Sequence, residues 1–182
     1  TVVNTYSQEE LTRLLKQYGQ EPFAYKIAAS IVSRRAEHTI DTTFELVDLI
    51  KSVLPQKVLN KKGHPAKRSF QAIRMEVNGE LDQLQVALEA GIHRLKPGGR
   101  LCVITFHSLE DRLVKNAFKA VATPKKVDRR LPATGIEVLE YRFINKKPII
   151  ASDEELAANK RSHSAKLRGI ERIRESANEE KK

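Results

Sequence analysis

The segment LKPGGRLCVITFHSLEDRLVK, from Leu95 to Lys115, predicts the fold class of this protein. A Pro-Gly-Gly turn leads into RLCVITF (100–106), an apolar run with β-branched residues that is typical of a strand buried on both faces. The following residues, HSLEDRLVKNAFKAV, place apolar side chains at helical spacing. A turn, a buried strand and a helix in direct succession predict an α/β domain.

A long amphipathic helix is predicted before this strand. Pro65 suits the first turn of a helix, where its missing N–H would be unpaired in any case. A single apolar stripe of about seven turns then follows, with a bend expected near Gly79. Its members step by three or four residues and are Phe70, Ile73, Val77, Leu81, Leu84, Leu88 and Ile92.

The sequence on either side of this region predicts further helices and strands. Residues 5–54 predict three short helices, two of which begin with capping boxes, at Ser7 and at Thr42. Toward the C-terminus, IEVLEYRFI (136–144) alternates as a strand, and KPIIAS (147–152) is a candidate partner for it. The basic stretch NKRSHSAKLRGIERIRES is interpreted as helical.

Composition limits the class of partner. Among 182 residues, 33 are Lys or Arg and 23 are Asp or Glu, and the resulting net charge of +10 favours a polyanion. Neither a transmembrane run nor a signal peptide is recognisable, and the single Cys102 excludes an intramolecular disulfide. We therefore expect a cytoplasmic protein without membrane contact. Because the first residue is Thr, we also expect a piece of a longer chain.

The strongest candidate site is the basic segment that precedes the long helix. His64, Lys67 and Arg68 lie close together in this segment, and no acidic residue occurs from Asn60 to Arg74. Positive charge at a helix start opposes the helix dipole, so it does not serve to stabilise the helix. Free N–H groups flanked by Lys and Arg favour an anion site. The alternative is a solvated basic loop.

A second candidate site lies at the carboxyl end of the predicted strand, where open α/β sheets bind ligands. His107 could contact a ligand there, whereas Ser108, with Asp111 three residues later, is expected to cap the next helix. The Gly98-Gly99 pair precedes a strand and is therefore interpreted as a turn and not as a phosphate loop. Cys102 is expected to be an inert core thiol, and no spacing of His or Cys predicts a metal site.

Basic residues recur near the C-terminus and suggest an extended surface suited to nucleic acid. They are Lys125, Lys126, Arg129, Arg130, Arg161, Lys166, Arg168, Arg172 and Arg174.

Three blocks together resemble a known family. In order, GHPAKRSFQAIRMEVNGEL (63–81), LKPGGRLCVITFHSLEDRLVK (95–115) and NKRSHSAKLR (159–168) are similar to the ribosomal RNA small-subunit methyltransferase H family. This resemblance implies transfer of a methyl group from S-adenosylmethionine to N4 of a cytidine in small-subunit ribosomal RNA. It also implies a Rossmann-like sheet with a helical insertion.

The resemblance covers only about the C-terminal three-fifths of a family member. The cofactor-binding motifs of the family lie in its N-terminal part, and none of them occurs in these residues. By resemblance, residues 1–62 are the helical insertion that caps the active site, and residues 63–182 are the later half of the methyltransferase α/β domain. We therefore expect a fragment that is inactive alone, in which no catalytic residue or general base is identified.

Methylation of a base requires that the cytidine be flipped out of its stack into a pocket. By resemblance, the residues of this chain would bind the RNA backbone and line that pocket. The candidates are His64, Lys67, Arg68, Gln71, Arg74, Asn78, His107 and Arg112. Two alternatives stay open: a stand-alone basic module for RNA binding or ribosome assembly, and a helical interaction domain whose charge only aids solubility. The interpretation as a methyltransferase fragment predicts a partial parallel sheet with one exposed edge. We expect this edge to be covered by self-association or strand exchange.

Overall fold

The computed structural model describes residues 1–124 and 139–174. The chain forms two compact units, Thr1–Glu80 and Leu81–Lys182, called the N-terminal and C-terminal units below. Compactness thus divides the chain after Glu80. The predicted division after residue 62 separates a helical insertion from the methyltransferase domain. It is a division by role, and it stays a prediction.

The N-terminal unit is helical, as predicted. Both capping boxes are confirmed: Glu10 closes the one at Ser7 and Glu45 closes the one at Thr42. The side chains of Leu11, Leu15, Ile27, Ile31 and Ile50 fill the core. The helices are α1 (Val2–Thr5), α2 (Gln8–Gln17), α3 (Ala24–Glu37), α4 (Thr43–Val53), α5 (Gln56–Leu59) and α6 (Lys67–Asn78).

The predicted long helix is broken into two. Helix α6 ends at Gly79, whose φ of 59° lies in the left-handed region that glycine adopts without strain. Helix α7 (Glu80–Arg94) starts at the next residue, and the break coincides with the boundary between the units. Pro65 precedes α6 instead of lying in its first turn, because the main-chain N–H of Lys67 bonds to the carbonyl of His64 in a separate turn.

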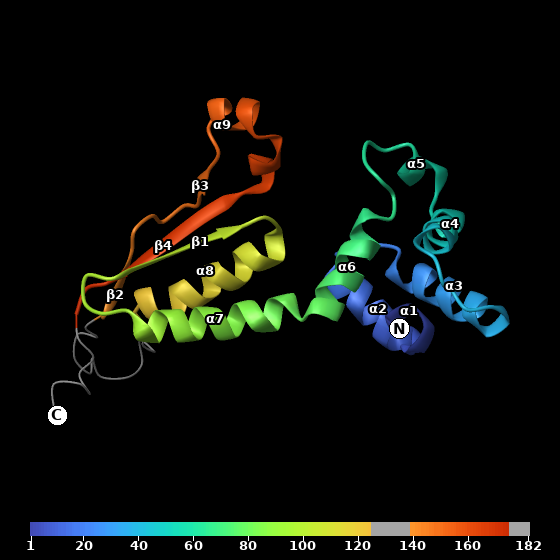
Figure 1. Cartoon of the computed structure of the whole chain (residues 1–182), viewed down its shortest axis with the longest axis horizontal. Helices are drawn as coiled ribbons and strands as arrows, with labels where there is room; N and C mark the ends of the chain where they lie inside the picture. The colour runs from blue at the N-terminus through green and yellow to red at the C-terminus, as the bar shows by residue number, and fades with distance from the viewer. Residues whose placement is uncertain (125–138, 175–182) are drawn as a thin grey trace, which may run out of the picture. The chain divides into compact units, whose positions relative to one another are not determined.

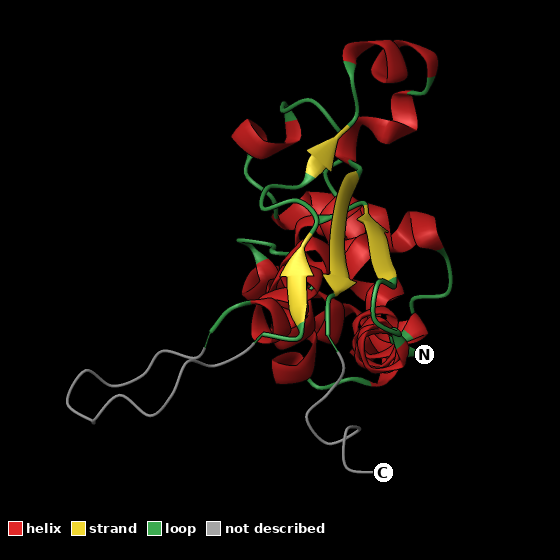
Figure 2. Ribbon diagram, turned by 90° about the vertical axis from the view of Figure 1, so that its left-hand side faces the viewer, coloured by secondary structure: helices red, strands yellow, loops and turns green. Residues whose placement is uncertain are grey.

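The C-terminal unit is a layer of helices against a small sheet. Strands β1 (Arg100–Thr105), β2 (Tyr141–Phe143), β3 (Ile149–Ile150) and β4 (Lys166–Arg172) form a four-stranded sheet in the order β1-β4-β2, and β3 also pairs with β4. Figure 2 shows β4 between its neighbours. Helices α7 and α8 (Ser108–Ala122) lie against one face of the sheet (Figure 1), and α9 (Asp153–Ala158) and the 3₁₀ turn η1 (Lys160–Ser164) connect β3 to β4.

The mixed α/β class is confirmed, but three predictions about the sheet were wrong. Every strand pairing among the described residues is antiparallel, where a partial parallel sheet was expected. The C-terminal stretch interpreted as helical contains β4, the central strand. The strand pattern was hidden because Arg168 and Arg172 take positions on the helix-covered face that a sequence pattern reserves for apolar residues. Strands β2 and β3 also pair with β4 and not with each other.

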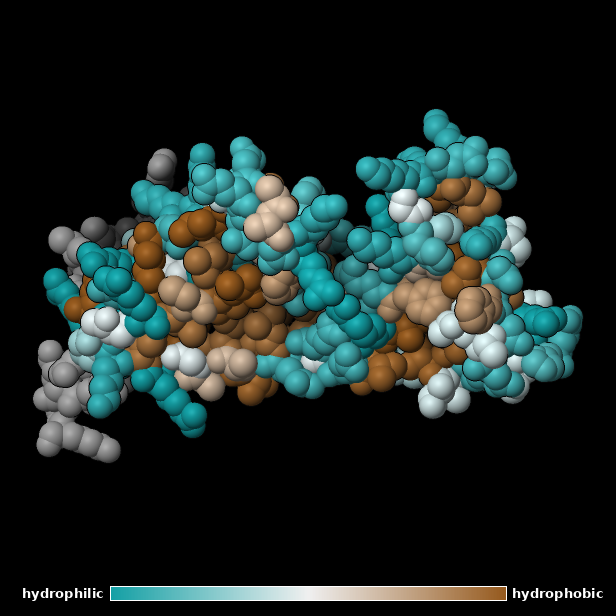
Figure 3. Space-filling view, turned by 45° about the horizontal axis from the view of Figure 1, so that its top comes forward, coloured by the Kyte–Doolittle hydropathy of each residue, from teal (hydrophilic) through white to brown (hydrophobic). Residues whose placement is uncertain are grey.

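Among residues 1–124 and 139–174, strand β1 is covered on one face only, so the expectation of burial on both faces was wrong. Leu101, Val103 and Thr105 point toward the helices, whereas Cys102 and Ile104 are exposed on the outer face. Cys102 is therefore a surface thiol and not a core one. In Figure 3 hydrophobic atoms gather on the exposed surface of this unit. Among the described helices, none combines the length and hydrophobicity that a membrane span needs.

Candidate nucleic-acid interface

The basic segment before α6 forms an exposed loop that turns into the helix. The Nδ1 atom of His64 accepts a hydrogen bond from the main-chain N–H of Ala66 at 3.3 Å, which fixes the ring against the turn. Helix α6 has Ala66 as its N-cap and no side chain capping its first N–H groups. An uncapped helix start offers these donors, together with the positive end of the dipole, to an anion. The side chains of Lys61, Lys62, His64, Lys67 and Arg68 are exposed around it.

Four of the predicted residues share one face of α6. Lys67, Gln71, Arg74 and Asn78 are spaced by four, three and four residues, which places them in one stripe along the helix. The opposite side of α6 is buried, with Ser69, Ala72 and Met75 in the N-terminal unit. The structure therefore brings these four candidates together. Arg68 lies beside the stripe, and its Nη1 atom donates to the carbonyl of Gln20 at 3.5 Å.

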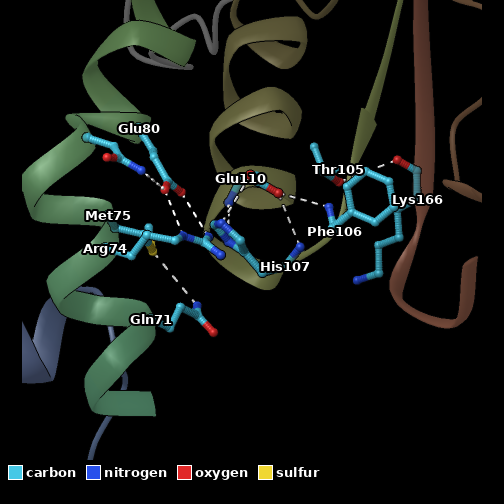
Figure 4. A network of polar contacts seen from close by, with 10 residues as sticks. Gln71, Arg74, Met75, Glu80, Thr105, Phe106, His107, Glu110 and Lys166 are labelled. Carbon is cyan, nitrogen blue, oxygen red and sulfur yellow. Dashed lines mark hydrogen bonds and ion pairs between the residues drawn. The ribbon is translucent and has the colours of Figure 1, made fainter. Parts of the chain in front are cut away.

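An acidic residue from outside the basic segment holds the end of this stripe. Glu80 accepts two hydrogen bonds from Arg74, at 2.8 and 3.0 Å, and one from Asn78 at 3.0 Å (Figure 4). Residues 60–74 contain no acidic residue, but in the folded protein the carboxylate of Glu80 lies against this basic stripe. Because the Arg74 side chain is 56% exposed, this ion pair stabilises by at most about 1 kcal/mol.

Contacts with the first helices of the N-terminal unit hold α6 in place. The Tyr6 hydroxyl donates to Glu76 at 2.9 Å, and this carboxylate raises the pKa of the hydroxyl. A Cβ atom on Gly19 would lie 2.7 Å from the Leu15 carbonyl oxygen and 2.8 Å from that of Arg68. Only glycine allows the chain after α2 to approach α6 so closely. The basic stripe is therefore carried on a packed element.

In the C-terminal unit, His107 caps a helix, a role that was predicted for Ser108. The His107 Nδ1 atom accepts from the main-chain N–H of Glu110 at 3.3 Å, and the Glu110 carboxylate accepts from the N–H groups of Phe106 and His107 (Figure 4). The Nε2 atom lies 3.1 Å from a Glu110 oxygen but lacks the alignment of a hydrogen bond. Ser108 is the exposed first residue of α8.

This arrangement limits what His107 can do. Its Nδ1 atom is occupied as an acceptor, so the proton of the neutral ring sits on Nε2. Only 15% of the side chain is exposed, which gives a ligand little access. Arg112, in contrast, is exposed on α8 and can reach an anion. Of these two candidates, Arg112 is therefore the one that is accessible to a ligand.

Two residues of the predicted C-terminal basic surface are structural. Arg168 binds Asp111 through two bonds, at 2.7 and 3.2 Å, and Lys166 lies 3.5 Å from the same carboxylate. The hydrogen bond from Arg168 is the main reason why the pKa of Asp111 is lowered. Arg172 is buried, donates to the Leu95 carbonyl at 2.7 Å and stacks over a tyrosine ring. Arg161 and Arg174 are exposed, and the basic residues from Lys125 to Arg130 lie outside the described residues.

The Gly98-Gly99 pair is a turn, as predicted. The Gly98 N–H donates to the carbonyl of Arg172 at 2.7 Å, and the Gly99 N–H donates to that of Lys96 at 2.8 Å. A phosphate-binding loop needs such N–H groups to point at the ligand. Here the protein's own carbonyls use them.

One cavity was not foreseen from the sequence. It measures about 690 Å³ and lies in the N-terminal unit, where α2 and the start of α3 line it with polar side chains that include Arg13, Lys16 and Tyr25. None of the eight predicted binding residues lines it. Arg13 and Lys16 lie on α2 and Tyr25 lies on α3, so no single sequence pattern links the two sides of the cavity.

The chain matches the family model described as the MraW methylase family over residues 1–173. It is 50% identical over 174 residues to the ribosomal RNA small subunit methyltransferase H of Caldicellulosiruptor bescii, covering 94% of this chain and 56% of that protein. The protein of the same name from Caldicellulosiruptor saccharolyticus is 52% identical, with the same two shares. The one from Clostridioides difficile is 49% identical over 173 residues. The chain thus spans a little over half the length of these relatives.

Proposed function

The chain belongs to the MraW methylase family, and from this membership we propose that it is the RNA-holding part of an S-adenosylmethionine-dependent methyltransferase. Its substrate would be N4 of a cytidine in small-subunit ribosomal RNA. The observation that carries the proposal is the 50% identity, over 94% of this chain, to a relative named ribosomal RNA small subunit methyltransferase H. The net charge of +10 and the exposed basic segment before α6 agree with an RNA substrate.

We propose that the described residues do not hold the cofactor by themselves. Binding of a nucleoside such as S-adenosylmethionine by a Rossmann-like sheet uses a glycine-rich loop after a strand. The glycine pair next to β1 precedes its strand, and its N–H groups are bonded within the protein. We therefore propose that the cofactor is held by residues beyond these, in a larger Rossmann-like sheet of which this chain supplies a part. Alone, the chain would not transfer a methyl group.

The residues of α6 would position the RNA. Methyl transfer to an exocyclic base nitrogen requires a flipped nucleotide, and holding it in line with the methyl donor supplies much of the rate. Lys67 and Arg68 would bind phosphates at the helix start, together with His64 and the free N–H groups. Gln71 would reach a base edge further along the stripe. Arg74 and Asn78 would first have to leave Glu80, so their contribution is expected to be smaller.

A second function is supported by the same charges. A basic module that binds RNA or assists ribosome assembly needs no cofactor and no reacting group. It would show the same salt-dependent binding through Lys67 and Arg68. The two functions differ in whether the protein, as it exists in its cell, binds S-adenosylmethionine. Intact mass and calorimetric titration of that protein with the cofactor separate them: a mass above 20.6 kDa with cofactor binding supports the methyltransferase. A mass of this chain alone without binding supports the module.

The RNA contact is tested by charge neutralisation on α6. The double variant Lys67→Gln/Arg68→Gln is compared with Lys26→Gln/Lys51→Gln, which removes the same charge from exposed positions on α3 and α4. Binding of a fluorescent single-stranded RNA of small-subunit sequence is measured by anisotropy at several salt concentrations. Each lost phosphate contact lowers the slope of log affinity against log salt by about 0.7. We expect a reduction near twice that value for the α6 variant only.

Equal slopes for the two double variants would contradict the assignment of the RNA contact to α6. Such a result would leave the net charge, and not this site, as the cause of RNA binding. Because this assay involves no cofactor, it tests the interface independently of the methyl transfer.

A further inference from the structure

The cavity of about 690 Å³ in the N-terminal unit has a lining that suits an unpaired nucleotide. Its volume lies within the range of about 300–1,000 Å³ that is typical of ligand-binding sites. Helix α2 contributes Gln8, Arg13, Lys16 and Gln17 to the lining, and α3 contributes Tyr25. Cations contact phosphates, amides contact a base edge, and an aromatic ring contacts the plane of a base.

The two cations of the lining are not engaged within the described part of the protein. Arg13 and Lys16 lie three residues apart on α2, which places their side chains next to each other on an exposed face. No hydrogen bond or ion pair joins either side chain to another residue of the ranges 1–124 and 139–174. The lining also contains Glu9, which lies in the first turn of α2, where the helix dipole stabilises its charge. With two cations against this carboxylate, the lining keeps a positive charge.

Tyr25 provides an exposed aromatic ring beside these cations. It lies in the first turn of α3 and is 63% exposed, because the buried side of this helix is formed by Ala24, Ile27, Ala28 and Ile31. A single exposed aromatic residue is common in proteins and indicates nothing by itself. At the border of a charged cavity, however, the ring is a surface on which a base can stack, and such stacking accepts any base.

The composition of this lining argues against a face built for packing. A surface that packs against another protein segment is apolar at its centre and keeps charged residues at its rim. In this cavity Arg13, Lys16 and two glutamines accompany a single ring. Covering them with protein would take two unpaired charges out of water, at a large cost in free energy unless partners are supplied. A phosphate backbone supplies such partners while solvent still reaches the cavity.

The cavity lies close to the basic segment before α6. The N–H of Gln20 donates to the carbonyl of Lys16 at 3.1 Å, and the Gln20 carbonyl accepts from Arg68 at 3.5 Å. Gln20 thus joins the end of α2 to a cation of the proposed RNA interface, inside one compact unit. A strand bound at the start of α6 is therefore close enough to continue into the cavity. This continuity favours a nucleotide within a strand over a free nucleotide.

We propose that this cavity binds one unpaired nucleotide of the RNA, with the base stacked on Tyr25 and the neighbouring phosphates bound by Arg13 and Lys16. The amides of Gln8 and Gln17 would bind the base edge. This inference rests on the proposed function, because its ligand is the RNA that the basic segment before α6 would bind. It adds a contact away from α6, and two contacts fix the direction of a strand where one does not.

The stacking is tested with Tyr25→Leu and Tyr25→Phe. Because only the phenylalanine keeps a ring, RNA affinity should fall about tenfold in Tyr25→Leu and stay near the wild-type value in Tyr25→Phe. Phe44→Leu is the matched control, since Phe44 is 77% exposed but lies on α4 and outside the cavity lining. Affinity is measured by anisotropy with the same single-stranded RNA, and circular dichroism should show that all three variants are folded.

The base that stacks is identified with 2-aminopurine at successive positions of the RNA. Stacking on an aromatic ring quenches the fluorescence of this base. We expect one position whose fluorescence is quenched by the wild type and by Tyr25→Phe, but not by Tyr25→Leu. A merely structural role of Tyr25 would not produce such a position.

The phosphate contacts are tested through the salt dependence. Arg13→Gln/Lys16→Gln should lower the slope of log affinity against log salt by about 1.4, which is twice the value of about 0.7 for one phosphate contact. Arg34→Gln/Lys51→Gln removes the same charge from exposed positions outside the cavity lining and should leave the slope unchanged.

The outcomes separate this site from the proposed function. If Lys67→Gln/Arg68→Gln weakens RNA binding while Tyr25→Leu equals Phe44→Leu, the cavity is not a nucleotide site and the interface on α6 stands. Absence of RNA binding by the wild-type chain would overturn this proposal and the RNA-holding role together. Tyr25-dependent binding of cytidine monophosphate, with RNA affinity independent of Tyr25, would identify a free nucleotide as the ligand and overturn the assignment to RNA.

Discussion

Replacing Asp111 with asparagine is expected to lower the free energy of unfolding of the C-terminal unit by about 2–4 kcal/mol. The carboxylate joins α8 to the central strand through two hydrogen bonds to Arg168, and the two side chains are only 13% and 11% exposed. Removal of one partner leaves the other charge largely buried without compensation. The loss falls short of the range of about 3–5 kcal/mol for fully buried pairs because some solvent reaches both side chains.

The assay is urea unfolding followed by far-UV circular dichroism for the wild type, Asp111→Asn, Arg168→Met and the double variant Asp111→Leu/Arg168→Met. The double variant leaves no unpaired charge between these two positions, so its loss should be smaller than the sum of the single losses. Glu80→Gln is the control, because the exposed Arg74–Glu80 pair stabilises by at most about 1 kcal/mol. A loss for Asp111→Asn as small as that of the control would refute the reasoning.

The pH dependence gives the prediction a second readout. The pKa of Asp111 is lowered below its ordinary 3.8, first by the hydrogen bond from Arg168. A carboxyl whose pKa is lower in the folded state stabilises the fold above its unfolded pKa, and this contribution is lost as the pH falls through the folded value. The difference in stability between wild type and Asp111→Asn should therefore be constant near neutral pH and shrink below about pH 4.

Two further predictions concern positions where the main chain is constrained. Gly19→Ala should destabilise the N-terminal unit by about 1–3 kcal/mol in thermal or urea unfolding, because the added Cβ meets main-chain oxygens of α2 and α6 at 2.7 and 2.8 Å. The control Gly91→Ala, which meets only a leucine side chain at 3.3 Å, should be neutral or stabilising, and equal losses for the two would be evidence against the close contact. His107→Ala should lose about 1 kcal/mol through its helix cap while His107→Asn keeps most of it. If RNA affinity fell in both His107 variants by the same factor, the residue would be an RNA contact and not only a cap.

Local signals in the sequence were reliable where one short segment contains all the partners of an interaction. The capping boxes at Ser7 and Thr42 join groups three residues apart, and both formed. The turn at Gly98-Gly99 was recognised from its local Pro-Gly-Gly pattern, and the Gly99 N–H bonds to the carbonyl of Lys96, three residues earlier. The break at Gly79 was expected only as a bend, because the apolar stripe continues through it and gives no sign that the two halves belong to different compact units.

Predictions failed where the partner of a residue is distant in the sequence. Arg168 and Arg172 look like surface charges until the fold supplies Asp111 and the Leu95 carbonyl, and their inward positions concealed the central strand. The site changed for a different reason, because its partner is near in the sequence: Glu80 lies just beyond the basic segment and holds Arg74 and Asn78.

The sequence by itself determined the helices of the N-terminal unit, the strand that follows the Pro-Gly-Gly turn, the basic segment before α6 and the resemblance to a methyltransferase family. These depend on local propensity, on charge and on the order of residues. Only the tertiary structure decided which face of β1 is covered, which arginines are structural and which side chain caps α8. Burial and ion pairing depend on which elements meet in space, and hydrophobic periodicity does not record whether a second layer is there to cover a strand.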